Sequence, residues 1–100
     1  MKYATIEEQI KSVDARWKRA AVDAAAVAMS RYPDAPRWRR QAEALAICPL
    51  LKYLEEQLKA AVDAVRNAED PCTRYQAGLT LTARNNAVQD MTRRIMRATK

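Results

Sequence analysis

The residue types that carry most enzyme and metal chemistry are absent or too few in this chain. It has no histidine, one glycine, and two cysteines, Cys48 and Cys72. Histidine is the commonest general base and metal ligand, and a structural zinc site usually needs four Cys or His ligands. A glycine-rich phosphate loop needs several glycines. The sequence therefore predicts a protein that is not an enzyme and holds neither a metal nor a cofactor.

Carboxylates are present, but their pattern is that of a solvated surface. Between positions 52 and 70, acids and bases alternate in sign at spacings of three and four. This spacing places them on one face of a helix, opposite a line of leucines. We interpret this face as salt-bridged and exposed, and not as a catalytic carboxylate pair.

Two short segments place a tryptophan among bases: Arg16-Trp17-Lys18-Arg19 and Arg37-Trp38-Arg39-Arg40. Tryptophan and arginine dominate the binding hot spots of protein interfaces, and aromatic side chains in basic patches also stack on unpaired bases. Trp17 falls on an apolar helix stripe and is assigned to the core. Trp38 lies in the first turn of a predicted helix, and we expect it at the edge of the core.

The C-terminal third contributes a second basic group, which ends in Arg97 and Lys100, and two tandem asparagines. The helix dipole favours one or two cations in the last turn of a helix, but it does not account for four bases in eight residues. A helix-turn-helix around Gly78 is rejected, because Asp70-Pro71 interrupts the helix that should precede it. The predicted partner-binding set is Arg37, Trp38, Arg39, Arg40, Asn85, Asn86, Arg93, Arg94 and Arg97.

The net charge of +6 is unevenly distributed along the chain. Residues 1–40 carry +4, residues 41–70 carry −3, and residues 71–100 carry +5. The acidic middle can neutralise part of its neighbours. The excess positive charge lies near both ends of the sequence.

Two runs of apolar residues, spaced three and four apart, predict the helices that must position these groups. Each run forms one stripe of a helix, and we expect both stripes to be buried. The first is Ile6, Ile10, Val13, Trp17, Ala20, Ala24 and Val27; the second is Ile47, Leu51, Leu54, Leu58, Ala61, Val65 and Ala68.

The boundaries follow from capping residues and prolines. Thr5 and Glu8 fit a capping box, and Pro33 ends the first helix near Arg31. A second helix begins near Pro36 and meets Pro49, where we expect either a kink or a break. A third covers 50–69, and the last runs from about Thr82 to Arg97, with Val88, Met91 and Ile95 facing inward.

The fold class is therefore all-α, a single domain over residues 1–100. It is a small antiparallel helical bundle of three to four helices with a proline kink or break near Pro49. Residues 71–81 are left unassigned, because Gly78 and the Leu-Thr-Leu-Thr stretch interrupt any helical period.

The sequence also indicates a location and a redox state. Residues 1–10 lack an apolar segment typical of a signal peptide, and no uncharged run is long enough to span a membrane. We expect a cytoplasmic protein without membrane contact. If 49–70 is helical, Cys48 and Cys72 lie too far apart for a disulfide, so two free, buried thiols are expected.

These observations favour a non-catalytic helical module or inhibitor that binds a protein or a nucleoprotein complex. A phage-type accessory or anti-CRISPR-like role is consistent with the size and helical style of the chain, and no stretch of residues identifies a family. One alternative is a sequence-tolerant nucleic-acid-binding protein that uses its basic ends. Another is a structural homodimer, in which a second copy completes the apolar stripe; the 20 alanines favour such close helix contacts.

Overall fold

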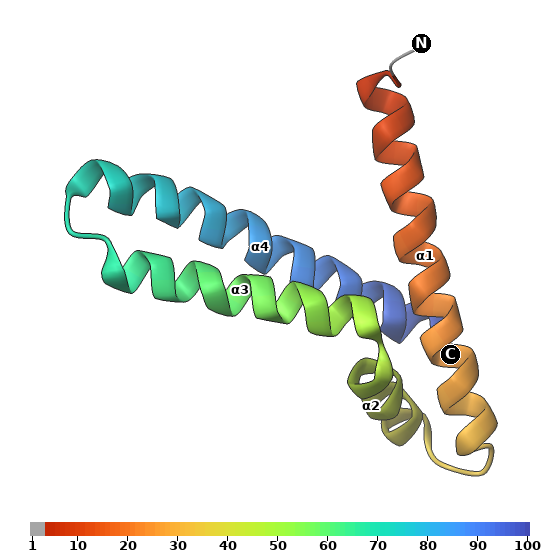
Figure 1. Cartoon of the computed structure of the whole chain (residues 1–100). Helices are drawn as coiled ribbons and strands as arrows, with labels where there is room; N and C mark the ends of the chain where they lie inside the picture. The colour runs from red at the N-terminus through yellow and green to blue at the C-terminus, as the bar shows by residue number, and fades with distance from the viewer. Residues whose placement is uncertain (1–3) are drawn as a thin grey trace. The chain divides into compact units, whose positions relative to one another are not determined.

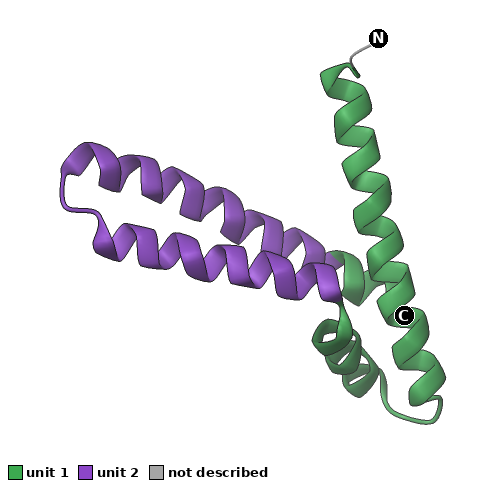
Figure 2. Ribbon diagram, in the orientation of Figure 1, with its two compact units in different colours: residues 1–48, 94–100 green, residues 49–93 purple. Residues whose placement is uncertain are grey.

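The computed structural model describes residues 4–100 and confirms the all-α fold class. Its helices are α1 (Ile6–Arg31), α2 (Arg37–Ile47), α3 (Pro49–Asn67) and α4 (Pro71–Ala98) (Figure 1). They form two compact units (Figure 2). Unit 1 comprises Met1–Cys48 and Arg94–Lys100, and unit 2 comprises Pro49–Arg93. The long helix α4 contributes its last turn to unit 1 and the rest to unit 2.

Helix α1 begins and ends where the sequence predicts. The Thr5 hydroxyl accepts a hydrogen bond from the Glu8 amide at 3.2 Å, and the Glu8 carboxylate accepts one from the Thr5 amide at 3.2 Å. This capping box satisfies two amides that a helix start leaves unpaired. At the other end, Tyr32 leaves the helical conformation ahead of Pro33, because proline disfavours a helical residue before it.

Pro49 breaks the chain into two helices. Cys48 adopts an extended conformation, with φ −75° and ψ 112°, and Pro49 is the first residue of α3. Proline is tolerated at a first helical position, because its missing N–H would have no helical partner there. The break therefore costs little, whereas a proline inside one continuous helix would remove a backbone hydrogen bond.

Helix α4 is longer than predicted, because it begins at Pro71 and continues through the unassigned segment 71–81. The Asp70 carboxylate accepts a hydrogen bond from the Thr73 amide at 3.2 Å, which caps the helix. Hydrogen bonding from the Thr73 side chain, and then from its amide, lowers the pKa of Asp70. Further along, the Thr80 and Thr82 hydroxyls donate to backbone carbonyls one turn earlier. The threonines are thus compatible with a helix, and no turn of a helix-turn-helix forms at Gly78.

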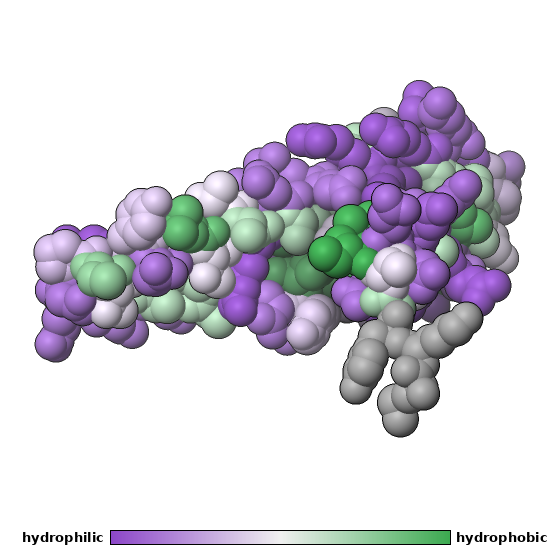
Figure 3. Space-filling view, turned by 90° about the horizontal axis from the view of Figure 1, so that it is seen from above, coloured by the Kyte–Doolittle hydropathy of each residue, from purple (hydrophilic) through white to green (hydrophobic). Residues whose placement is uncertain are grey.

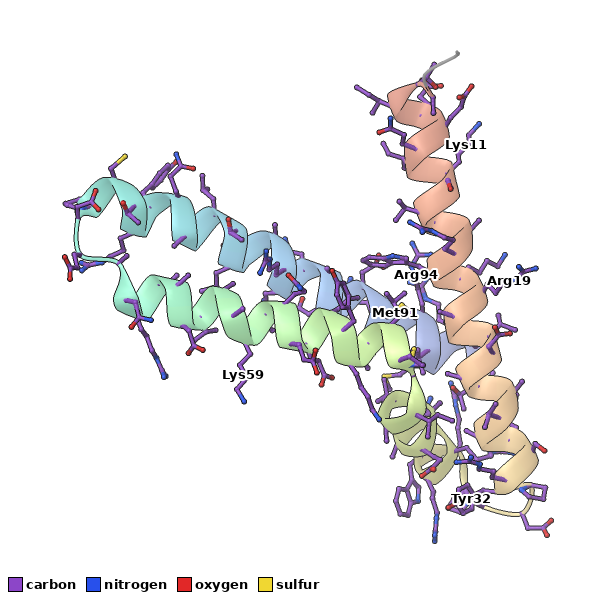
Figure 4. The ribbon with its side chains drawn as sticks, in the orientation of Figure 1. Lys11, Arg19, Tyr32, Lys59, Met91 and Arg94 are labelled. Atoms are coloured by element: carbon purple, nitrogen blue, oxygen red, sulfur yellow. The ribbon has the colours of Figure 1, made fainter. Side chains whose placement is uncertain are left out.

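Unit 2 is an antiparallel hairpin of α3 and α4, connected by residues 68–70 (Figure 1). The members of the second apolar run within this unit are buried or half-buried, as predicted, and Met91 of α4 is fully buried. The opposite side of α3 carries the alternating charges; Lys59, for example, points away from α4 (Figure 4). The exposed part of the interpretation of that face is confirmed, whereas no ion pair joins its charged residues within residues 4–100, so its salt-bridged part is wrong.

Unit 1 has a core of small side chains. Helix α1 packs against α2 and buries a face made of alanines. The buried residues of the unit are Ala21, Ala24, Ala25, Ala28, Ala44, Cys48, Ile95 and Thr99. Small side chains let helix backbones approach closely but remove little apolar area from water.

The expectation that the whole first stripe is buried is wrong. Ile6, Ile10 and Val13 are 75%, 63% and 40% exposed, and no residue from 4 to 20 is buried. Val27 is also 42% exposed. The buried line of α1 starts at Ala21, so Ile6, Ile10 and Val13, near the start of the helix, remain exposed. Cys72 is exposed as well, in contrast to the predicted buried thiol, whereas Cys48 is buried and both thiols are free.

Gly78 in the middle of α4 leads to a prediction about stability. A Cβ atom at this position would meet nothing within 4 Å. Glycine in a helix interior is about 0.5–1 kcal/mol less favourable than alanine, so we expect Gly78→Ala to raise the free energy of unfolding by about that amount. Urea denaturation followed by circular dichroism at 222 nm measures the change. The control is Ala60→Gly at an exposed position of α3, which should lower it similarly; an unchanged or lower value for Gly78→Ala would contradict the prediction.

Candidate functional site

The first turn of α2 presents three exposed side chains: Arg37, Trp38 and Arg39. Trp38 is 69% exposed, so its expected place at the core edge is wrong. The reason is that α2 packs with the face that carries Ala44 and Cys48 toward the core. Trp38 lies on the opposite line, shared with the exposed residues Ala42 and Ala46. We call Arg37, Trp38 and Arg39 the α2 cationic surface.

Packing within unit 1 orients part of this surface. The Arg39 guanidinium lies over the ring of Tyr32 in the preceding loop, 5.1 Å from the ring centroid. The neighbouring Arg40 is half-buried, and its Nε has no hydrogen-bond partner. The cation–π contact with Tyr32 holds the Arg39 guanidinium in place, and its N–H groups can still donate hydrogen bonds to a partner. The ion pairs Arg31–Glu43, at 3.8 Å, and Arg94–Asp14 both take their base from outside α2.

Arg94 has a different role from the other predicted bases. Its guanidinium pairs with the Asp14 carboxylate, donates to the Asp14 carbonyl at 3.3 Å, and lies 5.9 Å from the centroid of the Trp17 ring. Figure 4 shows its side chain directed at α1. Trp17 is half-buried in this arrangement. Arg94 therefore ties the last turn of α4 to α1, whereas Arg97 is exposed.

The remaining members of the predicted set lie in unit 2. Asn85, Asn86 and Arg93 are exposed on α4, and Arg93 donates to the side chain of Gln89 at 3.5 Å. Nearby Arg84 points into the hairpin and donates to the Gln57 carbonyl of α3 at 2.9 Å. The predicted set is thus divided: Arg37, Trp38, Arg39, Arg40, Arg94 and Arg97 belong to unit 1, and Asn85, Asn86 and Arg93 to unit 2.

A further exposed surface consists of residues that the sequence predicts in the core. Ile6, Ile10 and Val13 are spaced four and three apart on α1, and they form an exposed apolar line. In the space-filling view, unit 1 shows a group of strongly hydrophobic residues at its surface (Figure 3). We call these three residues the α1 apolar line. Their spacing predicted the line itself, but spacing alone does not show whether the same chain covers it.

The two units differ most clearly in their net charge. Unit 1 contains 12 bases and 6 acids, so it carries the entire net charge of +6. Unit 2 contains 6 of each and is neutral. Among residues 4–100, no group of three or more His, Cys, Asp and Glu is placed to hold a metal ion, and no helix is long and apolar enough to cross a membrane.

The different surroundings of Arg94 and Arg37 lead to a prediction. Arg94→Ala removes a charge-assisted contact between α4 and α1, and we expect it to lower the free energy of unfolding by about 1 kcal/mol. Arg37→Ala removes an exposed base and should change it by less than about 0.5 kcal/mol. Urea denaturation of both variants checks this. Equal effects would contradict the separation into a structural and a free arginine.

Comparison with known proteins gives no relative for this chain: no family model, no curated protein and no solved structure matches it. Functional inference about this protein therefore depends on its own residues and their contacts.

Proposed function

We propose that this protein is a non-catalytic binding module whose unit 1 docks on a partner protein, alone or within a nucleoprotein complex. The observation that carries the proposal is the α1 apolar line. Ile6, Ile10 and Val13 lie on one side of a helix that has no buried residue before Ala21. An amphipathic helix with an uncovered apolar face is suited to a hydrophobic groove of another protein.

The energetics support a protein partner more than a nucleic acid. Full burial of an isoleucine or valine side chain contributes about 1.5–3 kcal/mol. Three such residues on adjacent turns therefore offer a substantial gain to a partner that has an apolar groove. A phosphate backbone offers no such groove, and electrostatic binding makes no use of aliphatic side chains.

The α2 cationic surface adds a second contact of complementary chemistry. Exposed Trp38 provides a large amphipathic area, and Arg37 and Arg39 have no carboxylate partner among the described residues. Tryptophan and arginine are the residues most enriched at binding hot spots. Since unit 1 also carries the whole net charge, the matching surface of the partner is acidic.

The test uses tagged full-length protein as bait, with specific and control variants captured side by side. We expect Ile10→Asp and Trp38→Ala each to reduce the captured partner at least 10-fold, because both side chains are exposed and free to contact it. Tyr53→Ala is the matched control, since Tyr53 is a 56%-exposed aromatic residue of unit 2. Quantitative mass spectrometry of the captured proteins gives the readout, and circular dichroism verifies that each variant is folded. A partner retained equally by all three variants would overturn the proposal.

Electrostatic binding of nucleic acid is the second candidate, and the concentration of charge in unit 1 favours it. Neutralisation of four to six phosphates predicts a slope of log affinity against log salt of about −4 to −5 on duplex DNA. Fluorescence anisotropy with a labelled duplex and a labelled single strand, at about 50 and 200 mM salt, measures it. Replacement of both Arg37 and Arg39 by alanine should reduce the slope by about 2, whereas Ile10→Asp should leave it unchanged. Absence of binding at the lower salt would eliminate this candidate.

A homodimer that completes the first apolar stripe is the third interpretation. A charge at a position that is covered within one unit, such as buried Ala24 of α1 or half-buried Leu58 of α3, would not distinguish a dimer from a monomer. Such a charge would disrupt the fold whether or not a dimer exists. Ile10 is the informative position, because its side chain has no cover.

A further inference from the structure

The outward face of α4 in unit 2 is nearly free of charge. Between Pro71 and Gln89, only Arg74 and Arg84 are charged, in a chain where 30% of the residues are. Both guanidinium groups donate to backbone carbonyls of the hairpin: Arg74 to Ala68 at 3.2 Å and Arg84 to Gln57 at 2.9 Å. At 100° per residue, both also lie on the far side of α4 from Leu79.

The uncharged residues form one continuous strip along the helix. Their spacing of three and four aligns them, and all are exposed; Tyr75 and Leu79 are 67% and 52% exposed. Figure 3 views the hairpin from the α4 side and shows pale and green residues along it. We call this strip the α4 neutral face; it consists of Cys72, Tyr75, Leu79, Ala83 and Asn86.

Solvent exposure alone does not account for this composition. The outward side of α3, in the same hairpin, carries charges of both signs. Depletion of charged residues and enrichment of aromatic residues are instead typical of the centre of a protein interface. The α4 neutral face carries no charged residue and exposes the aromatic ring of Tyr75, and no described residue of unit 2 covers it.

We propose that the α4 neutral face binds the same face of a second copy of this chain, with the two α4 helices antiparallel. A twofold contact brings each surface against itself, so a charged face would repel its own copy, whereas an uncharged face does not. Unit 2 is neutral overall, so pairing through it is not opposed by net charge; pairing through unit 1, at +6, would be.

Charge at the two ends of the face selects the antiparallel orientation. Glu69 precedes α4, and Arg93 lies on the same side of the helix as Leu79 at the far end; both are exposed. An antiparallel pair centred on Leu79 brings Glu69 of one copy to about one helical turn from Arg93 of the other, whereas a parallel pair superimposes like charges. Asp90, next to Arg93, is half-buried and already interacts within its own chain.

The expected dimer is weak. The face from Cys72 to Asn86 is about 21 Å long at 1.5 Å per residue. One helix face of this length gives a total interface below about 1,200 Å², which is the size of transient complexes. The dimer should therefore form at high micromolar concentration, independently of any partner that unit 1 binds.

Sedimentation velocity of the full chain between about 5 and 500 µM tests the contact. We expect wild type to dimerise over this range and Leu79→Glu to raise the dimer dissociation constant at least 10-fold. The control is Tyr53→Glu, which places the same charge on an exposed residue of α3 and should dimerise like wild type. Circular dichroism verifies the fold of each variant.

Two results would overturn the proposal: a wild type that stays monomeric, or a Leu79→Glu variant that dimerises normally. Loss of the dimer in Ile10→Asp alone would also overturn it, because that result would place the contact on α1.

Cysteine oxidation tests the orientation. In the antiparallel pair the two Cys72 residues are about 20 Å apart, far beyond the roughly 7 Å that a disulfide allows. Oxidised wild type should therefore give no covalent dimer, and Cys48 is buried. Leu79→Cys, close to the twofold axis, should give one. Disulfide-linked wild type, or no linkage in Leu79→Cys, would contradict the antiparallel arrangement.

Discussion

The small size of the buried side chains is the constraint on which the rest of this structure depends. Seven of the eleven buried apolar residues are alanines, and the chain has no phenylalanine. Alanine brings helices close together, but each buried alanine removes little apolar surface from water. A core of this kind covers one narrow line on each helix. Larger apolar residues that lie off this line, or beyond its end, stay at the surface.

This constraint explains where sequence reasoning succeeded and where it did not. Helix boundaries depend on local chemistry, so Thr5 with Glu8 correctly predicted one helix start and Pro33 one helix end. The buried line of α3 was also predictable, because its large leucines have a single phase. The length of α4 was missed, because Gly78 and two threonines were treated as helix breakers. Their weak intrinsic preferences are overridden by the packing of α4 in the hairpin of unit 2 and by the cap at Asp70, and the helix satisfies both threonine hydroxyls.

The candidate surfaces could be predicted only in part, because residue type does not determine surroundings. Arg37, Arg84 and Arg94 are indistinguishable as residue types. In the folded chain, Arg94 binds Asp14, Arg84 binds a carbonyl of α3, and Arg37 remains exposed. Trp38 was misplaced for a related reason. The buried face of α2 is the one that carries Ala44 and Cys48. Small side chains such as these indicate burial less strongly in a sequence than a tryptophan does.

The two units use the same thin packing but leave different chemistry exposed. Unit 1 carries all of the net charge, together with an apolar helix end and an exposed tryptophan, a combination suited to a partner of opposite charge. Unit 2 is neutral, and two bases of α4, Arg74 and Arg84, donate to carbonyl groups of the hairpin on the far side of that helix from the exposed Tyr75 and Leu79. A neutral face can meet its own copy, whereas a basic one cannot. The proposed self-association and the proposed partner binding therefore have opposite electrostatic requirements, and the two proposals assign them to separate units.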